Sequence, residues 1–357
     1  MRHVLLTTDS VGGVWTYSLE LARGLLAHGY GATLAVLGPN PSQPQLQAAN
    51  AIRGLQVIPT GLPLDWTAVD EAELRVVAAN LAGLAGRLKV DRVHLHAPSL
   101  AAEAPWNVPV VAVAHSDVAT WWQANHGGTL PDDLAWRAAA TGRGLAEADA
   151  VIAPSVAFAD ALEGMYHPGR RIHVVHLGLA PFGQTTTPRE RAVLTVGRLW
   201  DASKNIAMLD RIAPTLDAPV MAVGALVRPD GAEVAFPSLT CSGPLTVAEL
   251  AEEYARATVF ASPARYEPFG LAVLEAAQAG CALALADIPT FRELWHGVAL
   301  FFHPQDDAGA RDAIGRLLRA PEAASERARA RAAEFSPAAM VDGTLMVHAT
   351  VPDQARA

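Results

Sequence analysis

Residues 261–280 read ASPARYEPFGLAVLEAAQAG, and this stretch is predicted to form the turn and helix around which the chain is organised. An apolar strand precedes it, and a Ser-Pro turn opens it. The apolar side chains from Leu271 to Ala277 recur with helical spacing. Pro268 favours a helix start here, because proline lacks the N–H that would have no partner at that position. The spacing therefore places Glu267 on the loop and Glu275 roughly two turns inside the helix.

The start of this predicted helix suits an anion. Backbone N–H groups at a helix start lack intrahelical acceptors and carry partial positive charge. In this helix they are predicted to be the N–H groups of Phe269, Gly270 and Leu271. An anion site flanked by two carboxylates fits a phosphorylated ligand with hydroxyl groups, such as a nucleotide sugar. Two Glu residues eight apart would also fit an exposed, dipole-stabilised helix face, and spacing alone favours that alternative. The flanking Pro-Phe-Gly and Glu-Ala-Ala-x-Ala-Gly sequences make the pattern more specific.

Composition limits the class of protein. The chain has 357 residues, of which 51% are hydrophobic and 18% are charged, so it can form two domains with ample cores. A net charge of −9 without a long Lys/Arg run argues against a nucleic-acid partner. Cys241 and Cys281 are too few for a disulfide framework and lack metal-binding spacing, which favours a reducing compartment.

Two apolar stretches bear on the location of the protein. The one at the N-terminus is too short for the core of a signal peptide. The stretch 269–286 is interrupted by Glu275, Gln278 and Gly280, so it reads as a helix and a strand rather than a membrane span. We therefore expect a cytoplasmic protein, and the sequence leaves a peripheral membrane contact open.

The first half opens like a doubly wound α/β sheet. A strand over 3–7 is followed by the turn Asp9-Ser10-Val11-Gly12-Gly13, a helix over 14–28 and a second strand over 32–37. Gly12 and Gly13 fit either contact with a ligand or tight packing of the helix on the sheet.

Further candidates follow later strands of this half. The strands predicted over 92–96 and 108–115 end in His96 and His115, and ligands of such sheets gather at the carboxyl ends of strands. No third potential ligand follows His94 and His96 at a spacing typical of metal sites, so structural roles are favoured over metal binding for these two histidines. Trp121 and Trp122 lie in a predicted loop that runs to Pro131. Their aromatic faces would pack well on an acceptor sugar, although most tryptophans are core residues.

The second half repeats the pattern after a polar linker at 180–188. A strand over 192–196 leads into Gly197-Arg198-Leu199, and Ser203-Lys204-Asn205 precede a helix over 206–212. We predict an N-terminal domain over 1–182, a C-terminal domain over 189–335 and a final helical tail over 336–357.

The segment VGRLWDASKN at 196–205, together with the Glu267–Glu275 pair in its setting, resembles the retaining glycosyltransferases of the GT-B architecture. The likeness is in particular to glycosyltransferase family 4, also described as glycosyl transferases group 1. The resemblance implies an α/β fold of two Rossmann-like, doubly wound domains facing a central cleft. It also implies that the N-terminal domain binds the acceptor, that the C-terminal domain binds the nucleotide-sugar donor, and that the final helix crosses back to the first domain.

The resemblance assigns roles to single residues. Arg198 and Lys204 would grip the donor diphosphate and stabilise its growing charge without a metal ion. Glu267 would bind the donor sugar's hydroxyls and Glu275 the ribose, since a carboxylate can accept from neighbouring hydroxyls. His115 would donate a hydrogen bond to a sugar hydroxyl.

The remaining donor contacts are also implied by the resemblance. The turn Gly12-Gly13 would lie next to the donor phosphate or the acceptor. The amides of Phe269, Gly270 and Leu271 would bind phosphate or sugar oxygens. The backbone of Gly243 and Leu245 would contact the nucleobase.

The implied activity is retaining, metal-independent transfer of a sugar from a nucleoside-diphosphate donor, with no cofactor. The acceptor could be a glycan, a lipid-linked molecule or a small molecule, and the sequence gives no oligomeric state. Two alternatives are a nucleotide-sugar epimerase, disfavoured by the Glu pair, and a non-catalytic nucleotide-sugar-binding subunit, disfavoured by the intact Arg198, Lys204, Glu267 and Glu275. A nicotinamide oxidoreductase is disfavoured further, because Gly12-Gly13 lacks the G-x-G-x-x-G spacing.

Overall fold

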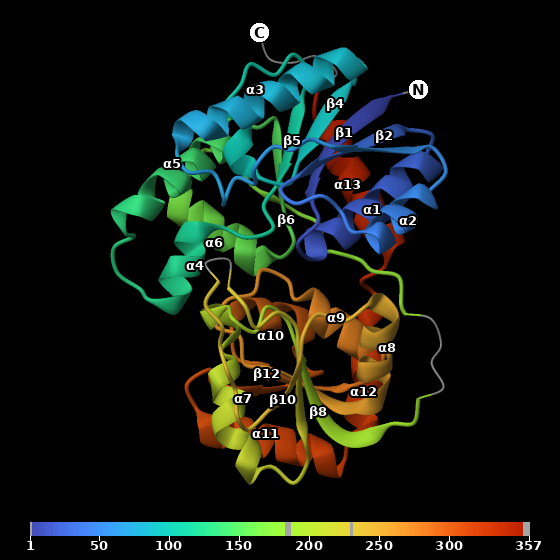
Figure 1. Cartoon of the computed structure of the whole chain (residues 1–357), viewed down its shortest axis with the longest axis vertical. Helices are drawn as coiled ribbons and strands as arrows, with labels where there is room; N and C mark the ends of the chain where they lie inside the picture. The colour runs from blue at the N-terminus through green and yellow to red at the C-terminus, as the bar shows by residue number, and fades with distance from the viewer. Residues whose placement is uncertain (1, 183–186, 229–230, 353–357) are drawn as a thin grey trace. The chain divides into compact units, whose positions relative to one another are not determined.

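The computed structural model describes residues 2–182, 187–228 and 231–352, which form two compact units (Figure 1). The first unit contains the chain up to Gln123, residues Gly127–Gly178 and the last helix from Pro337. The second contains Leu179–Ser336 and the short segment Ala124–His126. Residues 183–186 of the predicted linker and 353–357 of the predicted tail lie outside the described residues.

The first unit is built on a parallel sheet with the strand order β3-β2-β1-β4-β5-β6-β7. Its central strands are short runs of apolar residues that are buried on both faces, as parallel strands covered by helices require. The strands are β1 His3–Asp9, β2 Gly31–Leu37, β3 Leu55–Pro59, β4 Arg92–Leu95, β5 Val110–Val113, β6 Ala150–Ala153 and β7 His173–Val174.

Helices flank this sheet. Helix α13 packs against α1, and α5 packs against the turn η1 and against α3 (Figure 1). The elements are α1 Gly13–Ala27, α2 Gln43–Asn50, α3 Glu71–Leu88, η1 Pro98–Leu100, α4 Val118–Asn125, α5 Asp132–Glu147, α6 Val156–Tyr166 and α13 Pro337–Thr350.

The second unit holds a parallel sheet with the order β10-β9-β8-β11-β12-β13. Its strands are β8 Glu190–Val196, β9 Val220–Val223, β10 Thr240–Ser242, β11 Ala257–Ser262, β12 Ala282–Ala286 and β13 Leu300–Phe302. Its helical elements are η2 Ala202–Lys204, α7 Ile206–Ile212, η3 Ala213–Thr215, α8 Val247–Arg256, α9 Leu271–Gln278, α10 Pro289–Trp295, α11 Asp307–Arg319 and α12 Glu322–Ala332.

Both sheets have the Rossmann-like strand order, in which the chain starts in the middle, moves to one edge and then crosses over to the other side. The reversal lies between β1 and β4 in the first unit and between β8 and β11 in the second. At such a point the loops leaving two neighbouring strands diverge and leave room for a ligand. The predicted fold class of two Rossmann-like α/β domains is confirmed.

The last helix belongs to the core of the first unit. Gly24 on α1 leaves room for Val341 on α13, since a Cβ at Gly24 would lie 2.2 Å from a Val341 methyl carbon. The buried guanidinium of Arg92 on β4 donates to the carbonyl oxygens of His348, Val351 and Pro352 at the end of that helix. These contacts satisfy carbonyls that the helix end leaves without intrahelical partners.

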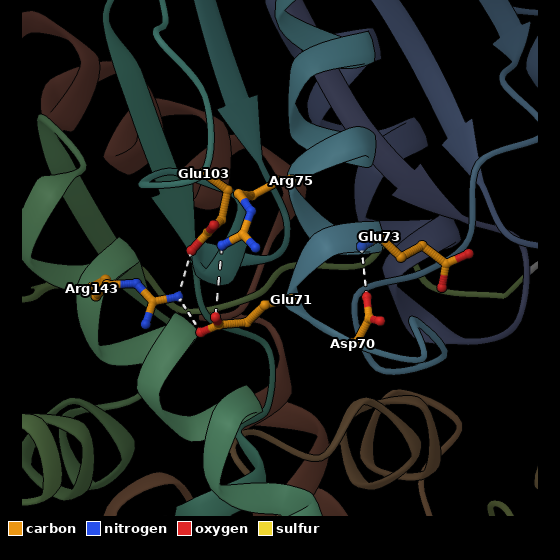
Figure 2. A network of polar contacts seen from close by, with 6 residues as sticks. All are labelled: Asp70, Glu71, Glu73, Arg75, Glu103 and Arg143. Atoms are coloured by element: carbon orange, nitrogen blue, oxygen red, sulfur yellow. Dashed lines mark hydrogen bonds and ion pairs between the residues drawn. The ribbon is translucent and has the colours of Figure 1, made fainter.

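Charged side chains connect α3, α5 and the segment after η1 (Figure 2). Arg143 on α5 donates to Glu71 on α3 at 2.8 Å and to the nearly buried Glu103 at 2.6 Å. Arg75 lies 3.7 Å from the other oxygen of Glu71. The start of α3 is capped by Asp70, whose carboxylate accepts from the Glu73 amide at 2.8 Å.

Gly144 on α5 is expected to be required by packing. A Cβ there would lie 1.8 Å from the carbonyl oxygen of Pro98 in η1, so the Gly144→Ala variant must displace backbone. We expect a loss of about 3 kcal/mol or more in the free energy of unfolding, measured by denaturant titration. The matched control is Gly86→Ala on α3, where a Cβ meets nothing within 4 Å. That variant should be neutral or more stable, by up to about 1 kcal/mol, and equal effects of the two substitutions would contradict this account.

Candidate active site

Two loops meet where the strand order of the second sheet reverses. The loop after β8 carries Lys204, and the loop after β11 carries Glu267. The Lys204 ammonium donates to Glu267 Oε2 at 2.6 Å, and the two side chains are only 19% and 20% exposed. The structure thus brings together two residues predicted from separate sequence motifs.

Hydrogen bonds to backbone carbonyls hold these two loops together. The buried Asn205 side chain donates to the carbonyls of Pro263 at 3.0 Å and Pro304 at 2.9 Å. The Arg265 amide donates to the Ser203 carbonyl at 2.8 Å. Asn205 has φ = 55°, a left-handed conformation that asparagine tolerates better than most residues. Its clamping role was not predicted, although an Asn directly before a helix signals a cap or turn.

Arg198 lies beside Asp201 on the same loop. Its guanidinium donates to Asp201 Oδ2 at 3.1 Å while its side chain remains 53% exposed. Burial alone would raise the pKa of Asp201, but hydrogen bonds from Ser203 and the charges of Arg198 and Lys204 hold that pKa below its usual value. Asp201 therefore stays ionised and fixes the turn that presents both cations.

The anion-suited helix start is α9, and its details differ from the prediction. Gly270 is the N-cap with φ = 95°, so regular helix begins at Leu271. Pro268 therefore lies before the cap rather than just inside the helix, and Glu275 lies about one turn in rather than two. The cause is the left-handed Gly270, which interrupts the helical backbone. A Cβ on Gly270 would crowd Phe291 at 3.0 Å and Glu267 at 3.3 Å.

Glu275 is held by a tyrosine that sequence reasoning missed. The hydroxyl of Tyr254, a fully buried residue on α8, donates to Glu275 Oε2 at 2.8 Å. Burial of the carboxyl group raises the pKa of Glu275 to about 7, and the hydrogen bond from Tyr254 opposes that shift. Gly243 and Leu245, predicted to face the nucleobase, lie in the loop between β10 and α8.

The first unit presents its candidates on a different set of loops. His115 follows β5, and its ring packs edge-on against Tyr17 at 4.8 Å and His96 at 5.0 Å between ring centroids. Burial lowers the pKa of His115 to about 4, so the imidazole is neutral near pH 7. Within the described residues, its Nε2 is buried and has no hydrogen-bond partner.

His115 ends a series of buried imidazoles, here called the histidine column: His115, His96, His94 and His348. Neighbouring rings in the column lie 5.0–5.3 Å apart. His94 Nδ1 and His348 Nε2 are 3.0 Å apart and share a hydrogen, and His96 Nδ1 lies 3.1 Å from Ser18 Oγ. The column extends from the loop after β5 to the last helix, and no pattern in the sequence indicated the part that His348 plays.

Two interpretations of this unit are corrected. Trp121 and Trp122 lie in helix α4, not in a loop, because residues 118–125 form regular helical turns. Both rings are partly exposed, with centroids 6.4 Å apart. Gly12 is the N-cap of α1 and is exposed, and a Cβ there would meet nothing within 4 Å. Tight packing therefore does not explain Gly12, and the adjoining Gly13 is the exposed first residue of α1.

Among the described residues, no cluster of three or more His, Cys, Asp or Glu side chains has the arrangement of a metal site. None of the helices in those residues has both the length and the apolar character needed to cross a bilayer.

The fold is that of GT-B glycosyltransferases. Comparison with known families agrees, because residues 11–181 match the family described as Glycosyltransferase Family 4 and residues 190–320 match Glycosyl transferases group 1. The chain is therefore a glycosyltransferase of the GT-B class.

Individual relatives are distant but cover nearly the whole chain. Glycogen synthase from Mycobacterium tuberculosis is 26% identical, over 90% of this chain and 86% of its own length. Sucrose-phosphate synthase from Thermosynechococcus elongatus has a TM-score of 0.79 at 18% identity, covering 98% of this chain and 99% of its own. Anabaena Alr3699/HepE, solved with UDP and glucose, has a TM-score of 0.71 at 15% identity, covering 98% and 100%.

The histidine column should make the protein sensitive to acid. Burial, with the charge of Arg92 adding to it, lowers the pKa of His348 to about 3 in the folded chain. In the unfolded chain the same imidazole takes up a proton below about pH 6.5, so protonation favours unfolding. Stability is therefore lost as pH falls from 6.5 toward 3. Relative to His348→Gln, the unmodified chain should lose roughly 2 kcal/mol between pH 7 and pH 5, measured by denaturant titration. An exposed-site control, His296→Gln, should leave the pH dependence unchanged, and a flat difference for His348→Gln would contradict this prediction.

Proposed function

We propose that the protein transfers a sugar from a nucleoside-diphosphate sugar to an acceptor hydroxyl, with retention of anomeric configuration and without a metal ion. The observation that carries the proposal is the Lys204–Glu267 pair at the reversal of the second sheet, next to the N-terminus of α9. A fixed cation, a hydroxyl-binding carboxylate and the amides at a helix start are the groups that suit a sugar diphosphate.

The diphosphate would bind to the cationic side of this site. An ammonium group has three donors, and Glu267 takes one of those on Lys204, which leaves the others for phosphate oxygens. Arg198 adds a second cation on the same loop, and the amides at the start of α9 add neutral donors. Glu267 would then accept from hydroxyls of the donor sugar close to the phosphate, and Glu275 from the ribose hydroxyls.

Bond cleavage would be driven by charge stabilisation. Negative charge grows on the leaving diphosphate, and preformed donors in a partly buried site stabilise it by about 2.7–4 kcal/mol each. The donor phosphate would take the acceptor's proton on the face where the bond breaks, which is how the configuration is kept. We propose that His115 donates one hydrogen bond from its neutral ring to a sugar hydroxyl, with no role as a base.

The relatives support the donor class. A glycogen synthase matches the sequence, and a structural neighbour was solved with UDP and glucose. We therefore propose a nucleotide sugar as donor and leave the base to a screen of UDP-, GDP-, ADP- and TDP-sugars. Independence from a metal, a cytoplasmic location and an acceptor contact at Trp121 and Trp122 stay predictions.

Lys204→Ala and Glu267→Ala should each lower turnover of the preferred nucleotide sugar by about 10²–10³-fold, because each removes one preformed stabilising contact. The chain has only two lysines, so Lys89→Asn is a matched control. Lys89 is an exposed helix cap in the left-handed region, a conformation that asparagine accepts, and its loss should leave turnover unchanged. Full activity of both site variants, with folding verified, would refute the assignment.

The stereochemical proposal has its own test. Proton NMR of the first product formed should show the donor's anomeric configuration, and excess EDTA should leave the rate unchanged, because Lys204 and Arg198 take the part of a metal ion. An inverted product would contradict the retaining mechanism, and loss of activity that added Mg²⁺ or Mn²⁺ restores would contradict metal independence.

A further inference from the structure

We propose that Tyr254 is a positioning residue for Glu275 and gives the protein its affinity for the ribose hydroxyls of the donor. The inference rests on the proposed function, in which Glu275 binds the ribose. Tyr254 lies on α8 and Glu275 on α9, so the contact connects two helices of the second unit.

The geometry leaves Tyr254 little freedom. Its side chain is fully buried, and its hydroxyl points at Glu275 Oε2 at 2.8 Å. The ring stacks on Phe182 with centroids 5.6 Å apart and lies 6.0 Å from the ring of Phe260. A ring fixed on both sides holds its hydroxyl in one direction, so the carboxylate that accepts from it is fixed as well.

Phe182 also ties this contact to the segment that joins the two units. The carbonyl of Leu179, at the start of that segment, accepts from the Gln278 side chain of α9 at 2.9 Å. Three residues on, Phe182 stacks on the tyrosine that binds Glu275 of the same helix. The segment is thus anchored to α9 twice, directly and through Tyr254.

Because of this hydrogen bond, the two carboxylate oxygens of Glu275 have different roles. Tyr254 occupies Oε2, which leaves Oε1 and the remaining lone pairs to accept from ribose hydroxyls. Glu275 is half-buried, whereas Tyr254 is fully buried, so of the two residues Glu275 is the one that a ligand can reach. The tyrosine therefore acts through Glu275 and does not itself touch the nucleotide.

The contact also governs protonation of Glu275. Its pKa of about 7 results from burial, and the bond from Tyr254 lowers it, so loss of the hydroxyl should raise the pKa. The other titratable groups nearby are Cys281, whose thiol donates to the Tyr254 carbonyl at 3.3 Å, and Arg189 and Arg329, which act on that thiol. Only the ionised carboxylate accepts from two hydroxyls, so donor affinity should fall as pH drops through this pKa.

The test compares UDP with 2′,3′-dideoxy-UDP by calorimetry between pH 6 and pH 8.5. Tyr254→Phe keeps the ring and removes the hydroxyl, and it should weaken UDP about 5- to 10-fold near pH 7, which corresponds to the net contribution of one ordinary hydrogen bond. The acid limb of UDP affinity should move to higher pH. Affinity for dideoxy-UDP should stay unchanged, and in turnover KM for the donor should rise while kcat stays the same.

Two more variants separate the ways in which this could fail. If Glu275→Gln leaves UDP affinity unchanged, the ribose role of Glu275 and that part of the proposed function are wrong. If Glu275→Gln weakens UDP but Tyr254→Phe does not, or weakens both nucleotides equally, the positioning role is wrong. Should Tyr254→Phe fail to fold, Phe182→Leu removes only the stacking and should weaken UDP selectively by a smaller factor; an unchanged UDP affinity would overturn the proposal.

Discussion

The ion pair between Lys204 and Glu267 is the contact on which the second unit's site depends. Reversal of strand order at β8 and β11 makes the loops leaving these strands diverge, and a gap between loops is otherwise open to water. The pair joins the loops through two side chains that are about four-fifths buried. Since a partly buried charge is costly without its partner, each residue requires the other. The ammonium group of Lys204 and the carboxylate of Glu267 are thereby fixed next to each other.

Small residues make that arrangement sterically possible. A Cβ on Gly224, at the end of β9, would lie 1.8 Å from the Gly197 carbonyl oxygen at the end of β8, so these two strands converge where the cationic loop begins. Gly270 does the same at the other loop, where its left-handed backbone lets α9 start directly beside Glu267. Gly224 and Gly270 thus let the loops that carry Lys204 and Glu267 start close to their neighbours.

Local patterns in the sequence predicted the two sheets, most of their helices and the loops with Lys204 and Glu267. Buried parallel strands are continuous apolar runs, and the turns between them contain Gly, Pro and Ser, so both leave strong local signals. What was missed depends on contacts between residues far apart in the chain. Tyr254 is 21 positions from Glu275 and His348 is 254 positions from His94, and nothing in the residue types reveals either pairing. The tryptophans of α4 were misplaced because that helix is short and its apolar pattern resembles that of a loop next to glycines.

The two sheets share a topology but carry different electrostatics at corresponding edges. The second presents the ion-paired side chains of Lys204, Glu267 and Arg198, whereas the first presents imidazoles that burial keeps neutral. A protonated imidazole would attract a diphosphate, whereas a neutral ring offers a hydrogen bond without that attraction. Packing of His115 against Tyr17 and His96 keeps its ring neutral. In the proposed reaction, the charge that attracts the leaving group therefore comes from the second unit alone.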